Sequence, residues 1–494
     1  MSSKIITRPW LALLGIGLAS FLGCIDFTIV NTALPVLQAS LKTSVSQLQW
    51  IINIFMLVLS ACMVVAGRFA DLHGRRKWLY IGMILFGLSS VGAGLSPSIN
   101  WLILFRLLQG LGVAILYTVP VAIIANSFPE AVRGRATGIL IGVNGLGLAA
   151  GPLMGGMILS FLSWRWIFFV NVPLIIVSLI ICSVTLIESK TDEVGAKIDW
   201  MGLILLMIGM PLMVYAVINS NSVLFGVGMA AMIALYFVEN KSSSPIIQFK
   251  LFANHKFLSA LIANFSLAFF YTVLFFLLPF YLHNIHLDSS WDIGLMLLPA
   301  TAMVAVLSPV VGHMVDSYGP KKMLMIGFSL FIISAIMQLF FGVQTSTVYI
   351  LIALLLFGIG WAFILSPSIV AAISAIHKNS SGVAMGTIGT LHNFGGAIGL
   401  AIGTVVYHYR AKFILLADLA KQNITAGAWT KQIISDPDNA INILSTHANI
   451  SVAKSTVLFQ NFFVQGYNSA IILLLLISLG ALLAVMFGIK AESK

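Results

Sequence analysis

Long apolar stretches alternate with short polar breaks along the whole chain. Each stretch is close to the length of about 20 residues that a helix needs to cross the hydrocarbon core of a bilayer. The apolar runs cover residues 10–34, 48–67, 78–96, 101–125, 136–160, 166–187, 199–219, 223–240, 257–283, 292–312, 323–342, 348–372, 382–408 and 466–489. We therefore predict an all-α integral membrane protein with 14 transmembrane helices, and the even number places both termini on one side.

The composition indicates that lipid is the solvent for most of this chain. Hydrophobic residues make up 60% and charged residues 8% of the 494 positions, whereas a soluble domain carries roughly 25% charged residues. The three cysteines, Cys24, Cys62 and Cys182, lie in apolar runs without metal or redox spacing, so we expect small buried hydrophobic side chains. No catalytic constellation and no phosphate-binding GxxxxGK loop appears, so we expect no enzyme activity, no cofactor, no metal and no use of ATP.

Positive charge is distributed unevenly between the two sides of the predicted membrane. With the N-terminus in the cytoplasm, 18 of the 26 Lys and Arg residues fall in inside loops and tails, 7 fall outside, and Arg106 lies within a span. Cytoplasmic loops of membrane proteins carry such an excess. We therefore expect both termini in the cytoplasm and a location in the inner (cytoplasmic) membrane. The net charge of +11 then reflects topology rather than nucleic-acid binding.

An internal repeat divides the chain into two similar halves. Residues 67–77 and 312–322 share Gly, Asp, Gly and a final Lys at the same offsets, one after the second span and one after the tenth. Halves that are parallel in topology are related by a pseudo-two-fold axis along the membrane normal. We therefore predict two six-helix bundles plus an inserted helix pair. The predicted divisions are 1–190, the pair 191–240, a basic amphipathic linker 241–256 on the membrane surface, and 257–494.

Two of the polar segments allow more than one interpretation. The repeated loop is either a conformational latch or a charged turn that only sets topology. Its Asp71 can meet the positive N-terminal end of a neighbouring helix or an arginine of its own loop. The latch candidates are Gly67, Asp71, Gly74, Arg75, Arg76, Asp316 and Gly319. The long outside loop 409–465 is either a cap or partner contact, or a tolerated insertion.

Several stretches resemble one family of transporters. Residues 67–77 look like the loop motif of the major facilitator superfamily. Residues 24–35 (CIDFTIVNTALP), 102–112 (LILFRLLQGLG), 147–156 (GLAAGPLMGG) and 164–174 (WRWIFFVNVPL) are similar to its drug:proton antiporter branch with fourteen spans. The resemblance implies proton-driven multidrug efflux, neighbouring first and fourth spans, and a fifth span that acts as a pivot sealing one face of the cavity. The antiporter motif supplies Gly147, Gly151, Pro152, Gly155 and Gly156.

Asp26 and Arg106 are the charged residues that lie well inside the predicted spans. Intramembrane charges are costly and mark functional sites. Counting residues from the span ends places them roughly 12 Å and roughly 8 Å below the outer surface, so they can interact directly or through water. We expect Asp26 to exchange protons, because burial disfavours a charged carboxylate and a nearby arginine favours it. The alternative is a static ion pair.

His392 is the third candidate for proton coupling, because histidine titrates in the physiological range. A neutral histidine that is hydrogen-bonded to a neighbouring helix is an equal alternative. Aromatic residues of the ninth span offer some apolar lining, although most must face lipid or neighbouring helices. Polar residues expected to reach a substrate cavity are Asn31, Gln109, Tyr117, Asn144 and Asn393.

These observations together predict a proton-coupled antiporter that exports amphipathic or cationic drugs by alternating access. Its partners would be a small-molecule substrate, protons and the lipid bilayer, no nucleic acid is expected, and a periplasmic adaptor is left open. The alternatives are export of one native metabolite, such as a siderophore or lipid-like molecule, uptake, and a non-transporting sensor of the same fold.

Overall fold

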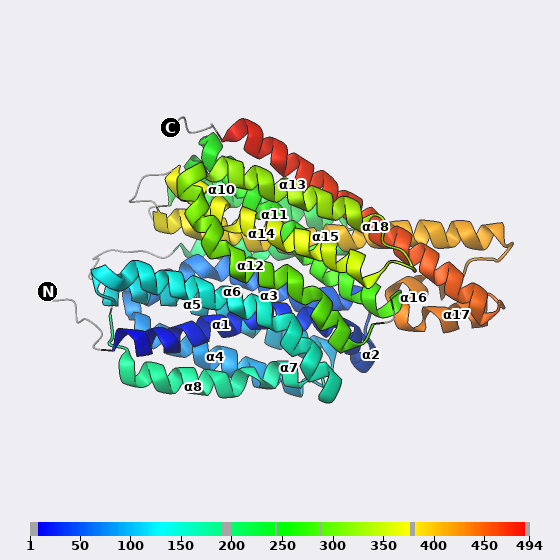
Figure 1. The fold of residues 1–494 in the computed structure, drawn as a ribbon, viewed down its shortest axis with the longest axis horizontal. Helices are drawn as coiled ribbons and strands as arrows, with labels where there is room; N and C mark the ends of the chain where they lie inside the picture. Colours follow the sequence, from blue (N-terminus) through cyan, green and yellow to red (C-terminus); the bar gives the residue numbers. More distant parts are fainter. Residues whose placement is uncertain are drawn as a thin grey trace.

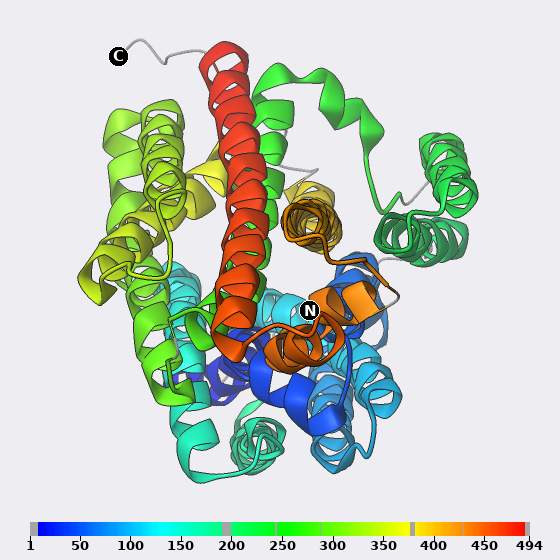
Figure 2. The ribbon, with the colours of Figure 1, turned by 90° about the vertical axis from the view of Figure 1, so that its right-hand side faces the viewer.

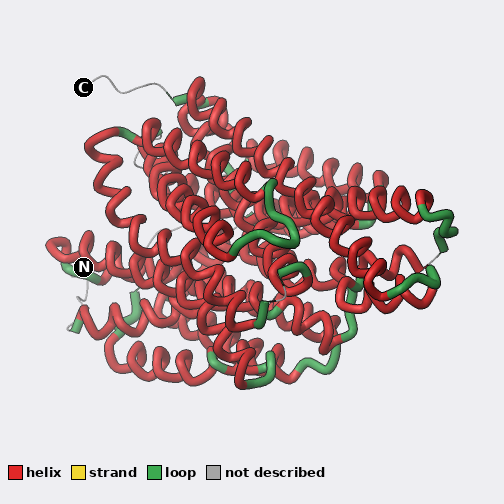
Figure 3. The backbone as a smooth tube through the Cα atoms, turned by 45° about the vertical axis from the view of Figure 1, so that its right-hand side comes forward, coloured by secondary structure: helices red, strands yellow, loops and turns green. Residues whose placement is uncertain are grey.

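A computed structural model describes residues 8–189, 199–242, 245–286, 288–375, 381–427 and 429–489. Within these ranges the chain is helical, without strands (Figure 3). Among the described residues, fourteen helical segments are long and apolar enough to cross a membrane, as the sequence predicted. Figure 1 shows both termini at one end of the molecule, which we call the terminus side, and α16 and α17 at the other end, the loop side.

The first half contains the helices α1 (Pro9–Thr32), α2 (Leu34–Leu41), α3 (Val45–His73), α4 (Arg75–Leu95), α5 (Ile99–Ser127), α6 (Glu130–Phe161), α7 (Trp166–Phe169) and α8 (Asn171–Thr185). The inserted pair is α9 (Trp200–Ile218) and α10 (Ser222–Lys241). The second half contains η1 (Phe249–Ala253), α11 (His255–Asn284), α12 (Ser290–Tyr318), α13 (Pro320–Gln338), α14 (Thr347–Ser374), α15 (Ser381–Lys421), α16 (Trp429–Ser435), η3 (Pro437–Asn439), α17 (Ala440–His447) and α18 (Val452–Gly488).

The two halves repeat one helix design, which is clearest in α3 and α12. Each is 29 residues long and begins with a capping box, in which Ser44 or Ser289 accepts from a backbone N–H in the first turn. Each ends at a glycine with a positive φ, +112° at Gly74 and +78° at Gly319. Residues other than glycine rarely adopt that backbone, so the repeated glycines fix where both helices stop.

The halves meet along two helix pairs, α6 with α12 and α3 with α15. The view along the bundle shows the first half and the second half side by side, with α9 and α10 standing outside both (Figure 2). Helix α9 packs against α3 and α15, and the rings of Trp50 and Tyr215 lie 6.1 Å apart there. Helix α10 packs mainly on α9, so the inserted pair borders one of the two contacts between the halves.

Helix α11 is the most buried span of the second half. Of its most apolar stretch of 18 residues, 89% lies inside the protein. Most of its aromatic residues were expected to face either lipid or neighbouring helices. Two of them illustrate contact with a neighbouring helix, α14. Phe270 stacks at 5.3 Å from Phe357, and Tyr271 stacks at 4.6 Å from Trp361. The linker before α11 contains only the five-residue helix η1 within the part of it that the structure describes.

The outer segment 409–465, which was predicted as a long loop with helix-like pieces, is largely helical within its described residues. Helix α15 continues to Lys421 instead of ending at 408, and α18 begins at Val452 instead of 466. Ala411, Leu415 and Leu419 follow at helical spacing and are buried, which makes this part an amphipathic helix despite its polar residues. Figure 1 shows α15 and α18 projecting to the loop side, with α16 and α17 beside their projecting ends.

Candidate functional site

A buried polar cluster surrounds Asp26 in the first half. Asp26 of α1 is 0% exposed and Arg106 of α5 is 1% exposed. Arg106 Nη1 donates to Asp26 Oδ2, so the two intramembrane charges that the sequence singled out meet directly. Arg106 Nε also donates to the backbone O of Ile51 at 3.0 Å, and its guanidinium lies 4.1 Å from the ring centroid of Phe55. Arg106 therefore joins α5 to both α1 and α3.

Two amides and a hydroxyl complete this group, which we call the Asp26 cluster. Gln109 Nε2 donates to Asp26 Oδ1 at 3.3 Å and to Ser90 Oγ at 2.8 Å. Asn171 Nδ2 donates to the same two oxygens at 3.3 Å and 3.4 Å. One carboxylate thus receives N–H donors from three side chains on α5 and α8, an arrangement that stabilises a buried negative charge.

A second polar cluster lies in the other half around His392 of α15. Its Nδ1 is 2.7 Å from Asn264 Oδ1, and its Nε2 is 3.1 Å from the hydroxyl of Tyr271. Asn264 Nδ2 in turn donates to Ser368 Oγ at 2.9 Å. The imidazole is therefore hydrogen-bonded to the neighbouring helix α11 at both nitrogens, which is the geometry of the static alternative considered above.

The two clusters approach each other through aromatic rings. The ring of Phe27, next to Asp26, meets the ring of Tyr271 edge-on at 5.7 Å. Tyr271 carries the hydroxyl that contacts His392. The contact between α1 and α11 thus places one aromatic pair between the polar groups of the two halves.

The glycines of the antiporter motif allow α6 to lie against two helices at once. A methyl group on Gly147 would lie 2.8 Å from Phe21 O of α1, and one on Gly155 would lie 3.0 Å from Ile29 O. Gly151 also faces α1, whereas its neighbour Pro152 lies on the opposite face, against α12. A methyl group on Gly156 would lie 2.8 Å from Ser290 O of α12. The motif therefore permits close helix packing on both sides of α6, whereas its role as a pivot stays a prediction.

The contact between α6 and α12 is closed on the loop side and open on the terminus side. A methyl group on Gly145 would lie 3.1 Å from Ala305 Cα. Closer to the terminus side, a methyl group on Gly142 or Gly138 of α6, or on Gly312 of α12, would meet no described atom within 4 Å. The two helices therefore separate beyond Gly145.

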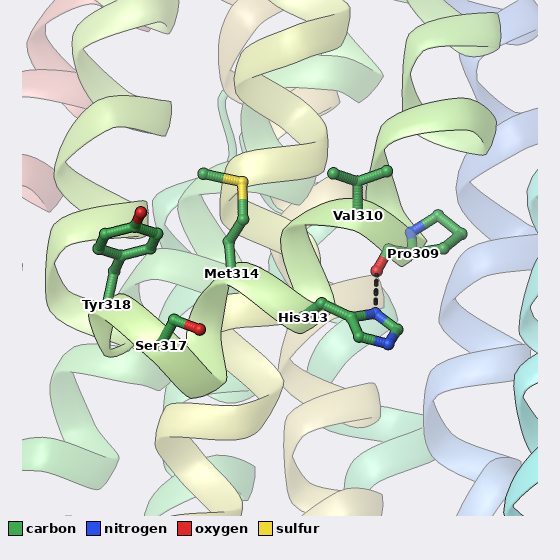
Figure 4. Close-up of a pocket in the computed structure, with 6 residues that line it drawn as sticks. All are labelled: Pro309, Val310, His313, Met314, Ser317 and Tyr318. Carbon is green, nitrogen blue, oxygen red and sulfur yellow. Dashed lines mark hydrogen bonds between the residues drawn. The ribbon is translucent and has the colours of Figure 1, made fainter.

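A different stripe of α12, in which Val310 and Tyr318 are exposed, forms a shallow hollow near the terminus side. A pocket of about 530 Å³ is lined by Pro309, Val310, His313, Met314, Ser317 and Tyr318, all from α12 (Figure 4). His313 turns its Nδ1 back to Pro309 O at 3.0 Å, as Figure 4 shows.

The contact between α3 and α15 contains a reciprocal pair of hydrogen bonds, which we call the clasp. Ser60 Oγ donates to Thr390 O at 2.6 Å, and Thr390 Oγ1 donates to Ser60 O at 2.9 Å. Nearer the loop side, Thr404 Oγ1 donates to Gln49 Oε1 at 2.7 Å. These bonds join the two halves, so any rearrangement that separates α3 from α15 must break them.

The repeated loop makes its contacts inside the first half. Arg75 Nε donates to Asp71 Oδ1 at 2.8 Å, so Asp71 pairs with an arginine of its own loop. The positive end of α4 is instead capped by Glu188, whose carboxylate accepts from the backbone N–H groups of Arg76 and Lys77 at 3.0 Å each. The predicted latch thus ties α3 and α4 to the end of α8 in this arrangement.

The remaining latch candidates are placed as follows. Gly67 faces α5, where a methyl group would make ordinary contact with Thr118 at 3.7 Å. Gly319 adopts the positive φ described above. The side chain of Asp316 lies outside the described residues.

Comparison with known proteins identifies the chain. The family model of the Major Facilitator Superfamily matches residues 16–400. This chain belongs to that superfamily. The multidrug resistance protein Stp of Mycobacterium tuberculosis is 32% identical over 404 residues, covering 79% of this chain and 74% of Stp. The riboflavin transporter RibZ of Clostridioides difficile is 28% identical over 397 residues, covering 80% of this chain and 87% of RibZ. Superfamily members are transporters rather than enzymes.

Solved structures support the same fold. A bacterial homologue of the human lysosomal transporter Spinster, in an inward-facing and unoccupied conformation, superposes with a TM-score of 0.69. It is 16% identical and covers 99% of both chains.

The predicted cavity residues of this superfamily member do not share one environment. Gln109 belongs to the buried Asp26 cluster and is 0% exposed, and its placement in a cavity stays a prediction. Asn31 donates to the backbone O of Phe27 at 3.1 Å, and Tyr117 donates to Cys24 Sγ at 3.3 Å. Both polar groups are thus engaged within the first half.

The other two cavity candidates lie closer to the contacts between the halves. Asn393 Nδ2 donates to Gly389 O at 2.9 Å and contacts Met63 Sδ of α3 at 3.6 Å. Asn144 of α6 has a buried Oδ1 that accepts no hydrogen bond from any described residue. Asn144 is therefore a polar group with acceptor capacity beside the point where α6 and α12 separate.

Sequence reasoning missed three residues of this site. Asn171 and Ser90 form hydrogen bonds within the Asp26 cluster, and Glu188 caps the N-terminal end of α4. The signal for Asn171 was available, because it is a lone amide in an otherwise apolar span. Ser90 and Glu188 carry no comparable signal. The cysteines are free, with Cys24 and Cys182 buried as expected and Cys62 partly exposed.

Proposed function

We propose that this chain is a proton-coupled antiporter that exports amphipathic or cationic small molecules across the cytoplasmic membrane. The observation that carries the proposal is the buried Asp26–Arg106 pair. A carboxylate held by an arginine within a membrane is a group whose interactions change when a proton binds. The likeness to Stp, a multidrug resistance protein, supports drugs as the substrate class.

The arrangement of the halves fits one stage of an alternating-access cycle. The positive-inside distribution supports termini in the cytoplasm, and with that orientation the separated ends of α6 and α12 face the cytoplasm. A charged Asp26 bound to Arg106 then corresponds to a carrier that is ready to load its substrate from inside. Proton binding from the outside neutralises Asp26, weakens its hold on Arg106 and favours the return of the empty carrier.

His392 and the span 5 glycines have supporting roles in this proposal. His392 lies across the Phe27–Tyr271 contact from Asp26 and is a candidate for a second proton site. Gly147, Gly151 and Gly155 let α6 move as one body with α1, while Gly156 keeps the loop side sealed against α12.

The test is transport by purified protein in liposomes with an imposed pH gradient, followed with a cationic dye. Wild type should expel the dye only with the gradient, and Asp26→Asn should lose the gradient dependence. Asp418→Asn provides a matched control, because it makes the same chemical change outside the membrane region on the projecting part of α15. Undiminished gradient-driven transport by Asp26→Asn would show that Asp26 does not couple proton flow.

A second candidate function is the export of one native metabolite. The observation in its favour is the likeness to RibZ, a riboflavin transporter, over 80% of this chain. The same liposomes loaded with riboflavin distinguish the two functions. Movement of riboflavin without movement of cationic dyes would favour a metabolite carrier, and movement of several unrelated dyes would favour multidrug export.

A further inference from the structure

Asn171 takes part in the Asp26 cluster with only one end of its amide. Its Nδ2 lies 3.3 Å from Asp26 Oδ1 and 3.4 Å from Ser90 Oγ. Its Oδ1 is buried and accepts no hydrogen bond from any residue in the described part of the chain. Asn171 itself is 0% exposed. A buried acceptor without a donor is unfavourable, and such a group in a native structure has a reason.

The other amide of the cluster differs in this respect. Gln109 Oε1 accepts from Arg106 Nη1 at 3.0 Å, while its Nε2 donates to Asp26 and Ser90. Both ends of Gln109 are therefore committed while Arg106 stays in place. Asn171 is the amide in this cluster that has a spare acceptor next to the carboxylate.

We propose that Asn171 is a positioning residue that serves both protonation states of Asp26. With the carboxylate, Nδ2 donates to Oδ1, as observed. When a proton from water on the loop side binds Oδ1, a half-turn of the amide presents Asn171 Oδ1 to accept the new O–H. The two ends of an amide have nearly the same shape, so the turn needs little space.

Arg106 remains opposite Oδ2 during this exchange, because the proton binds the oxygen that faces the amides. Release of the proton to water on the terminus side restores the carboxylate and the original amide orientation. The buried oxygen without a donor is thus explained as the partner of the protonated state. This inference rests on the proposed proton coupling of Asp26.

The test is infrared difference spectroscopy of the purified full-length protein between high and low pH, which requires no transport. The carbonyl band of protonated Asp26 is assigned by its loss in Asp26→Asn. In Asn171→Leu, which removes both amide functions at similar volume, this band should move to higher frequency because the O–H has lost its acceptor. Asn171→Ala should give the same shift if the leucine variant does not fold.

Ser178→Ala is the matched control, because Ser178 of α8 donates to Gly15 O of α1 at 2.7 Å and does not contact Asp26. It should leave the Asp26 band unchanged. An unchanged band in the folded Asn171 variants, or an equal shift in the control, would overturn the inference. A band that moves as expected in a protein that transports no dye would support Asn171's role and refute the export proposal. Absence of any Asp26 band would refute both.

Discussion

The clasp between Ser60 and Thr390 gives the sharpest prediction about movement of the two halves. Its two hydrogen bonds, 2.6 Å and 2.9 Å long, join α3 of one half to α15 of the other. The double variant Ser60→Ala, Thr390→Val removes both hydroxyl donors. The backbone carbonyls that accept these bonds remain part of their own helices.

The magnitude follows from the number of bonds. Side-chain hydrogen bonds between membrane helices contribute about 0.6 kcal/mol each on average, so the clasp contributes about 1.2 kcal/mol to the arrangement in which α3 and α15 touch. A difference of about 1.4 kcal/mol is a tenfold change in an equilibrium constant. Loss of the clasp should therefore raise the population of the alternate arrangement roughly sevenfold.

The population is measured with spin labels on the other contact between the halves. Labels at Gly138→Cys and Gly312→Cys, in a background without the three native cysteines, report the separation of α6 and α12 on the terminus side. Both positions face open space within the described residues, so labels there should not disturb packing. Double electron–electron resonance should show a larger share of short distances in the double variant.

Two results would refute this reasoning. One is an identical distance distribution in wild type and the clasp variant, which would mean that α3 and α15 stay in contact throughout the cycle. The other is an equal redistribution in Ser178→Ala, whose hydrogen bond to Gly15 lies within the first half and should persist in every state.

Three further substitutions test stability, each followed by the thermal unfolding midpoint in detergent. Arg106→Ala leaves Asp26 buried without its partner and should destabilise by about 3–5 kcal/mol, and adding Asp26→Asn should restore part of this loss. Gly74→Ala forces a side chain into a backbone with a φ of +112° and should cost about 1–3 kcal/mol. Gly151→Ala crowds α1 and should cost about 1–3 kcal/mol. Gly142→Ala, which would meet no described atom within 4 Å, is the control for both glycines and should not lower the midpoint.

Hydropathy predicted the membrane helices well, because lipid imposes the same length and polarity on every span. The first span was expected at 10–34 and is Pro9–Thr32, and the third was expected at 78–96 and is Arg75–Leu95. The same criterion failed for 409–465, since helices continue beyond the membrane where polar residues are tolerated. There the buried series Ala411, Leu415 and Leu419 was the usable signal.

The sequence predicted the site residues only where a side chain is energetically unfavourable in its predicted position. Asp26 and Arg106 stood out because a charge in lipid is unfavourable, and counting residues placed them at similar depth. The sequence did not predict that Gln109 joins the Asp26 cluster, because an amide serves equally well in a cavity or a buried network. The clasp joins residues 330 positions apart through a serine and a threonine, which are common in membrane helices and carry no local pattern.

Arg106 offers a physical route from the proton to the contact between the halves. It holds Asp26 of α1 with one nitrogen and the backbone O of Ile51 in α3 with another, and it lies over the ring of Phe55. Helix α3 also carries Ser60, less than three turns beyond Ile51, where the clasp joins α15. In the proposed coupling, neutralising Asp26 weakens its attraction for Arg106 and so changes the pull of Arg106 on α3. A proton bound in the first half can therefore bias the clasp through a single helix, because coupling requires a two-state element that both sites contact.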